Sequence, residues 1–288
     1  MSPEAAAAAI HRPAPHFSIR PRKGWQVINV GEILAYRDLF YFLVWRDVKV
    51  RYAQSILGIG WAIIQPLFQT LIFTLIFSRV ESLQTQGGAT PYLLFSICAT
   101  VPWAFFSTSL NEASSVLVGQ AHMITKVYFP RLILPITAVL GKLLDLGIAS
   151  ALMIIVLIGS GRIPQIETLV LPVLVVVMIL SASGIGMLLT ALAVQYRDIR
   201  YAMSFLVQLL MYVSPVIFST TSVIPENLQL AYALNPMVGV IEGFRAALLG
   251  DQAMPWAMIG VSTLSSVAVF AIGALYFRRM ERFFADVA

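Results

Sequence analysis

The sequence predicts an all-α integral membrane protein. Of its 288 residues, 59% are hydrophobic and only 11% are charged, whereas a soluble domain carries about 25% charged residues. The apolar residues are gathered into separate blocks, several of which reach the roughly 20 residues that a helix needs to cross a bilayer. Because backbone polar groups in lipid must be satisfied within the segment itself, these blocks are expected to be helices rather than an open sheet.

The N-terminal part divides into a tail and a first helix. Residues 1–31 are rich in alanine, proline and arginine and lack the continuous apolar run of a signal peptide, so we expect a flexible cytoplasmic tail before a membrane domain at 32–282. Residues 37–53 are expected to form an amphipathic helix that lies along the bilayer surface. At about 100° per residue, its apolar arc is formed by Tyr41, Val44, Trp45, Val48 and Tyr52.

Six apolar blocks are expected to span the membrane. They lie near residues 57–77, 92–117, 132–158, 169–194, 201–219 and 256–277. A further apolar stretch at 224–250 is interrupted by Asn235-Pro236, and neither half is long enough to cross because proline breaks a helix. We therefore expect a re-entrant helical hairpin there, before the last span, buried against other helices or lining a cavity.

The distribution of lysine and arginine predicts the orientation. With six spans both termini share a side, and fifteen lysines and arginines fall on that side, against only Arg79, Arg162 and Arg245 on the other; Lys142, inside a span, is not counted. Cytoplasmic segments carry the excess of these residues. Both termini are therefore expected in the cytoplasm, on a multi-pass protein of the inner membrane.

The sequence lacks the residues that several kinds of chemistry require. The sequence has no G-x-x-x-x-G-K-[ST] phosphate loop, since Gly141-Lys142 is followed by Leu143, so the chain is not expected to hydrolyse ATP by itself. The single cysteine, Cys98, and the three histidines show no metal-ligand spacing, so neither a metal nor another cofactor is expected in this chain. We also expect no nucleic-acid partner.

Two alternative functions each rest on one pair of residues. Lys142 and Asp145 are three positions apart in a predicted span and can neutralise each other on one helical face; a proton relay is the alternative, although a proton-coupled carrier needs more such groups. A membrane-embedded transferase would rest on His122 and Asp198, and nothing else in the sequence supports it.

Aromatic residues are plentiful in the first, second and fifth predicted spans. Lipid-facing and interfacial positions explain most of them. A sugar polymer, however, could slide along aromatic faces, because sugar C–H faces stack on rings without a fixed hydrogen-bond register. The candidates for such a pore lining include Trp61, Phe68, Phe205 and Tyr212.

The order of several motifs resembles one known family. After the surface helix come RDVKVRYAQSILGIGWAIIQPL, KVYFPRLILP, YRDIRY, SPVIFS and NPMVGVIEGFRAALLG. This order is similar to that of the ABC-2 type permeases that export polysaccharides such as O-antigen, capsule and teichoic acid, and the similarity covers about residues 32–282. Each motif alone is weak, and the combination is specific.

The resemblance implies a subunit of an ATP-driven exporter of a lipid-linked polysaccharide. Two permeases, as a homodimer, would work with two separate ATPase subunits that bind ATP and magnesium. The surface helix and the loop at 122–135 would contact the ATPase, and the coupling residues would be Lys126, Tyr128, Phe129, Pro130 and Arg131. An ABC-2 permease for a drug or a lipid is the alternative within transport.

The basic cluster Arg46, Lys49 and Arg51 has two interpretations. The resemblance places it at the cytoplasmic mouth, where it could bind the diphosphate headgroup of the lipid-linked glycan or form a cytoplasmic gate. Membrane lipids offer the other partner, because a cation near anionic headgroups gains about 1 kcal/mol. A diphosphate site requires arginine, whose guanidinium binds phosphate bidentately, whereas a membrane anchor tolerates lysine.

Overall fold

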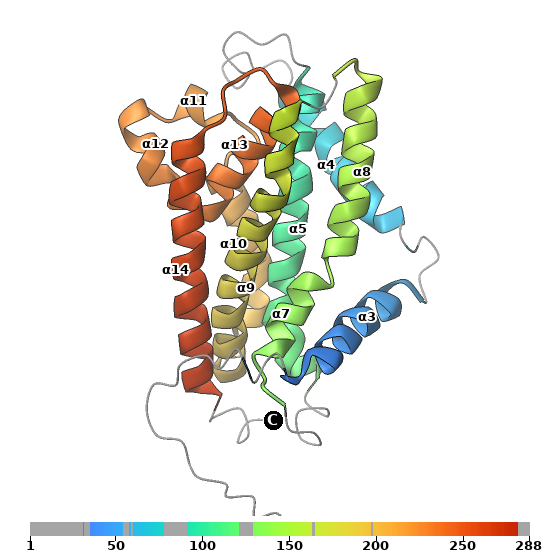
Figure 1. The fold of residues 1–288 in the computed structure, drawn as a ribbon, viewed down its shortest axis with the longest axis vertical. Helices are drawn as coiled ribbons and strands as arrows, with labels where there is room; N and C mark the ends of the chain where they lie inside the picture. The colour runs from blue at the N-terminus through green and yellow to red at the C-terminus, as the bar shows by residue number, and fades with distance from the viewer. Residues whose placement is uncertain are drawn as a thin grey trace, which may run out of the picture.

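The fold is a bundle of helices (Figure 1). The computed structural model describes residue 31 and residues 35–53, 58, 60–77, 91–120, 129–162, 165–196 and 198–281. Within these ranges every regular element is helical. The elements are α3 (Arg37–Ala53), α4 (Gly60–Phe77), α5 (Tyr92–Gly119), α7 (Ile133–Leu140), α8 (Leu143–Gly159), η2 (Ile166–Val170), α9 (Leu171–Gln195), α10 (Asp198–Val213), α11 (Thr220–Val223), α12 (Glu226–Tyr232), α13 (Pro236–Leu249) and α14 (Trp256–Met280).

Helix α3 has the same bounds as the predicted surface helix and lies obliquely at one end of the bundle (Figure 1). Its only buried residue is Leu43. Two members of the predicted apolar arc, Tyr41 and Trp45, are 72% and 48% exposed. These two aromatic residues are therefore not covered by the body of the protein, as expected of a helix whose apolar side meets a membrane or another molecule.

Five helical stretches are long and apolar enough to cross a membrane, so the chain is a multi-pass membrane protein. They are Gly60–Phe77, Tyr92–Leu117, Ile133–Gly159, Ile166–Gln195 and Trp256–Met280. The third is interrupted at Gly141–Lys142, between α7 and α8. All five correspond to blocks predicted as spans.

The block predicted as a span at 201–219 differs from the other five. Helix α10 ends at Val213, and its apolar part, Tyr201–Val213, is shorter than the other spans. The reason lies in Pro215, which lacks a backbone N–H and disfavours helix at the preceding residue. The chain then turns through Ser214–Phe218.

The core is formed by α5, α9 and α13, against which the outer helices pack. All fourteen residues of α13 are buried, and the window of α5 that could span a membrane is 78% buried. Close approach of α9 and α14 depends on Gly184, because a Cβ atom there would lie 2.6 Å from the Cα atom of Phe270. Small residues at such crossings allow the van der Waals packing that holds helices together in lipid.

The stretch predicted as a broken hairpin is indeed interrupted at Asn235-Pro236. Helix α12 ends at Tyr232 and α13 begins at Pro236, with the Asn235 side chain accepting a hydrogen bond from the Met237 backbone N–H at 3.1 Å. Both helices lie at the end of the bundle opposite α3 (Figure 1).

Arg245 was counted in the sequence as an outer charge, yet it is buried in α13. Its guanidinium contacts Glu242 at 3.2 Å and lies 3.6 Å from the centroid of the Phe95 ring. It also donates to the backbone carbonyls of Val216 and Phe218. These contacts satisfy a buried cation and hold the segment after α10 against the core.

Candidate functional site

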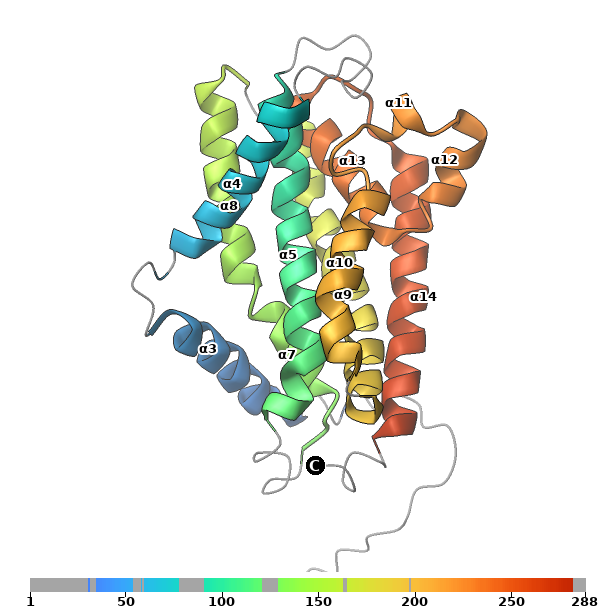
Figure 2. The ribbon, with the colours of Figure 1, turned by 180° about the vertical axis from the view of Figure 1, so that it is seen from behind.

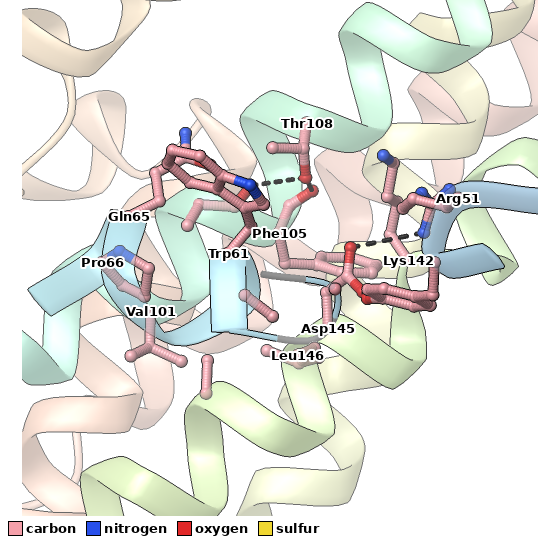
Figure 3. Close-up of a pocket in the computed structure, with 15 residues that line it drawn as sticks. Arg51, Trp61, Gln65, Pro66, Val101, Phe105, Thr108, Lys142, Asp145 and Leu146 are labelled. Carbon is pink, nitrogen blue, oxygen red and sulfur yellow. Dashed lines mark hydrogen bonds and ion pairs between the residues drawn. The ribbon is translucent and has the colours of Figure 1, made fainter. Parts of the chain in front are cut away.

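A cavity of about 190 Å³ lies where the end of α3 meets α4, α5 and α8 (Figure 3). Gly58, between α3 and α4 and in the cavity lining, has a left-handed φ of 48°, which glycine adopts without strain. Much of the wall is apolar, with Phe105 and Leu146 as its largest aromatic and aliphatic members beside Trp61. The polar and aromatic lining consists of Arg51, Tyr52, Trp61, Gln65, Thr108, Lys142 and Asp145.

Asp145 is the centre of the contacts between α3 and α8. The Tyr52 hydroxyl donates to one of its carboxylate oxygens, and Arg51 Nη1 lies 3.3 Å from the other. Arg51 also donates to the Gly141 carbonyl at 2.9 Å, at the break between α7 and α8. Burial, reinforced by the hydrogen bond to Asp145, raises the pKa of Tyr52 to about 12. Tyr52 is therefore a neutral donor across the physiological pH range.

The ion pair expected from the spacing of Lys142 and Asp145 is replaced by two longer-range pairs. Lys142 Nζ lies 3.2 Å from Glu112 of α5, and Asp145 is paired with Arg51 of α3. Lys142 is the N-cap of α8 and is still three positions before Asp145 on that helix. Each of the two instead has a partner of opposite charge on another helix within ion-pair distance. Each pair therefore joins two helices of the bundle.

The three basic residues predicted at the cytoplasmic mouth have different environments. Arg51 lines the cavity and is paired with Asp145. Arg46 lies 2.8 Å from its neighbour Asp47. Lys49 is exposed, with its ammonium 4.8 Å from the centroid of the Trp45 ring. A phosphate that binds Arg51 must therefore compete with the Asp145 carboxylate.

The residues predicted to couple to an ATPase fall into two groups. Phe129 and Pro130 are buried, and Arg131 donates to the Glu281 backbone carbonyl at 3.0 Å. Arg131 therefore ties the end of the loop to Glu281, the C-cap of α14. Lys126 and Tyr128 lie outside the described residues.

The four aromatic residues predicted for a pore are all exposed in the single chain. Trp61 and Phe68 on α4 are 55% and 61% exposed, and Phe205 and Tyr212 on α10 are 60% and 55% exposed. Each pair is seven residues apart and so follows one stripe along its helix. Figure 2 shows α4 and α10 on either side of α5, against which both pack. Trp61 alone among the four also lines the cavity.

Sequence reasoning singled out Arg51, Lys142 and Asp145 but missed three other polar members of the cavity lining. Tyr52 was assigned to the apolar arc of the surface helix, and Gln65 and Thr108 were not singled out. Tyr52 and Asp145 are 93 positions apart in the sequence, and no local pattern signals such a contact. The one available signal was Asp145 itself, because a charge inside a span is costly unless it is paired.

Comparison with known proteins identifies the family. The model of the ABC-2 type transporter family matches residues 38–249. The O-antigen export system permease protein RfbA of Myxococcus xanthus is 28% identical over 257 residues, covering 88% of this chain and 97% of that protein. A protein of the same name from Klebsiella pneumoniae is 25% identical over 260 residues, covering 90% and 97%. The polysialic acid transport protein KpsM of Escherichia coli is 22% identical over 241 residues, covering 82% and 91%. Since the family model covers well over half of the sequence, this membrane protein belongs to the ABC-2 type transporter family.

Proposed function

We propose that this chain is the permease subunit of an ATP-driven exporter that moves a lipid-linked polysaccharide, similar to O-antigen, across the inner membrane. The observation that carries the proposal is the similarity over nearly the whole chain to proteins named for O-antigen export. Because the sequence has no phosphate loop, ATP and magnesium are bound by a separate ATPase. Two permeases and two ATPases form the exporter.

The proposed topology has six spans, with both termini in the cytoplasm. Helix α10 and the turn after it form the fifth span, and α12 and α13 form a re-entrant hairpin on the outer side. Support comes from α13, which is completely buried and, at 14 residues, too short to cross the bilayer. Helix α12 has no buried residue, so only α13 is buried against other helices as the expected hairpin requires. Fifteen lysines and arginines fall on the side of the two termini and three on the other side, which supports a cytoplasmic location of both termini.

The cavity is the proposed cytoplasmic binding site for the diphosphate headgroup. Arg51 is its central cation, with Arg46 and Lys49 nearby on the same helix. Arg51 is paired with Asp145, and Lys142 with Glu112. A diphosphate that binds Arg51 therefore has to displace the Asp145 carboxylate. This exchange would loosen α3 from α8 only when cargo is present.

The surface helix α3 and residues 122–128 are the proposed contacts with the ATPase. Phe129 and Pro130 are buried and Arg131 is bound to Glu281, so of the coupling residues that the resemblance implies, Lys126 and Tyr128 are the ones proposed to contact a partner. The stripes on α4 and α10 are the proposed surfaces that face the second permease and the polymer. Exposed aromatic rings on both helices suit contact with sugar faces.

Deletion of the gene for this chain tests the function. We expect loss of polysaccharide from the cell surface and accumulation of lipid-linked glycan in the cytoplasmic leaflet. The intact gene should restore export, whereas co-expression with an ATPase that lacks its phosphate-loop lysine should not. Normal surface polysaccharide in the deletion strain would reject the proposal.

A further inference from the structure

A second, larger pocket lies at the end of the molecule opposite α3. Its volume is about 480 Å³, within the range of roughly 300–1,000 Å³ that is usual for small-molecule sites. It lies between η2, the end of α13 and the start of α14, towards the top of Figure 1. The side chains that matter for its chemistry are Gln165, Glu167, Asp251, Gln252 and Trp256.

The walls of this pocket are held in place without a ligand. Arg162 contacts Asp251 at 2.6 Å and donates to the Leu249 carbonyl at 2.9 Å. Gln252 donates to the buried Glu242 carboxylate at 3.3 Å. Gly250, with a φ of 68°, ends α13 in the left-handed conformation. The pocket is therefore preorganised, which lowers the entropic cost of binding.

One wall of the pocket carries an unsatisfied acceptor. An oxygen of the Glu167 carboxylate is buried and has no hydrogen-bond partner among the described residues. A buried polar atom without a partner is costly, and an ionised carboxylate can only accept hydrogen bonds. The oxygen itself has almost no accessible surface, so a ligand reaches it when the Glu167 side chain turns towards the pocket that it lines; a hydroxyl or amide N–H donor then satisfies it.

The pocket also has an apolar surface, which an aromatic ring provides. Trp256, at the start of α14, is 62% exposed and lines the same pocket. Anchoring at the membrane interface explains an exposed tryptophan at the end of a span. It does not explain the unsatisfied carboxylate oxygen and the two glutamine side chains in the same pocket.

We propose that this outer pocket binds a sugar residue, which stacks on Trp256 and donates hydrogen bonds to Glu167. A sugar ring combines an apolar C–H face with hydroxyl groups around its edge at this size. The ligand can be a unit of the exported glycan or the sugar headgroup of a glycolipid in the outer leaflet. The first source rests on the proposed function, whereas the pocket itself does not.

Saturation-transfer NMR on the complete exporter in nanodiscs tests the proposal. The first probe is the oligosaccharide that mild acid releases from the lipid-linked glycan of the cells that make this chain. The second is a nanodisc lipid, monoglucosyl diacylglycerol. Transfer from protein to sugar protons is expected with at least one probe, and which probe responds identifies the source.

Substitutions in the pocket distinguish a specific sugar site from non-specific binding. Trp256→Ala should weaken binding about tenfold through the loss of stacking, with Trp256→Phe keeping most of it. Glu167→Gln should weaken binding about tenfold, as expected for a hydrogen bond to a charged group. The matched control is Leu169→Ala, in η2 at a residue that is 75% exposed and outside the pocket lining; it should bind as the wild type does.

The results distinguish this proposal from the export function. No saturation transfer with either probe, or equal transfer in the wild type and in correctly folded Trp256→Ala and Glu167→Gln, overturns the sugar site. The ATP-driven export of the same wild-type preparation is measured separately. Sugar binding without export would reject the proposed export function but support the sugar site. Export without sugar binding would support the export function but reject the sugar site.

Discussion

At the scale of single residues, the carboxylate of Asp145 connects the surface helix to the bundle. It accepts from Tyr52 and pairs with Arg51, both of which come from the last turn of α3. The same Arg51 nitrogen, Nη1, contacts both the Gly141 carbonyl and Asp145. A planar guanidinium can in addition bind phosphate oxygens bidentately, which an ammonium cannot do.

Arginine-to-lysine changes test whether these cations recognise cargo. Arg46→Lys and Arg51→Lys should leave insertion and ATPase assembly intact but lower export by about tenfold, the loss expected for one charge-assisted hydrogen bond. Lys49→Arg should have a milder effect. Arg37→Lys is the matched control, since Arg37 lies at the other end of α3. Export at the wild-type rate in both variants, with normal expression, would reject the headgroup-recognition role and leave α3 as an anchor and coupling element only.

Removal of the Tyr52 hydroxyl tests how α3 is held. Tyr52→Phe keeps the ring but loses the hydrogen bond to Asp145, so we expect a loss of about 1 kcal/mol in the free energy of unfolding. Tyr41→Phe, on the same helix at a residue that is 72% exposed, should change nothing. Thermal unfolding of both variants in the same detergent gives the comparison, and equal midpoints would exclude a role for the Tyr52 hydroxyl.

At the scale of elements, the loop between α5 and α7 ends in a fixed segment. Phe129 and Pro130 are buried and Arg131 is bound to the end of α14. Force applied to the loop would therefore reach α7 and α14 together. Helix α7 in turn leads into the break at Gly141, to which Arg51 of α3 is bound.

Cysteine crosslinking tests this path. In a Cys98→Ala background, Lys126→Cys or Tyr128→Cys should form a disulfide with a co-expressed ATPase. Phe129→Cys is the control and should not crosslink, because Phe129 is 3% exposed. No crosslink at any position across residues 122–131 would exclude this loop as the contact.

At the scale of the whole molecule, composition and block length were sufficient to predict a helical membrane protein. The interruption at Asn235-Pro236 was also visible, because proline at that position starts a new helix. Pro215 signals the end of α10 at Val213, but the predicted span continued to residue 219. The contacts among Arg51, Tyr52 and Asp145 could not be predicted, because tertiary packing alone brings positions more than ninety residues apart together.

Reporter fusions test the proposed topology. A reporter after Gly87 or Gly250 should read as external, and one after Gln120, Asp198 or Ala288 as cytoplasmic. The reason is that lysine and arginine are concentrated in the segments that contain Gln120, Asp198 and Ala288. A cytoplasmic result at Gly250 would remove the re-entrant hairpin and require a seventh span.

ATP-driven export in a purified system tests the central claim most directly. Proteoliposomes that expose the cytoplasmic side would carry this chain, its ATPase partner and the lipid-linked glycan, with a glycosidase added outside. We predict that ATP with magnesium moves the glycan into the lumen, where it becomes protected, and that the chain without the ATPase neither hydrolyses ATP nor protects the glycan. Protection by the chain alone, or none with the complete assembly and ATP, would contradict the account.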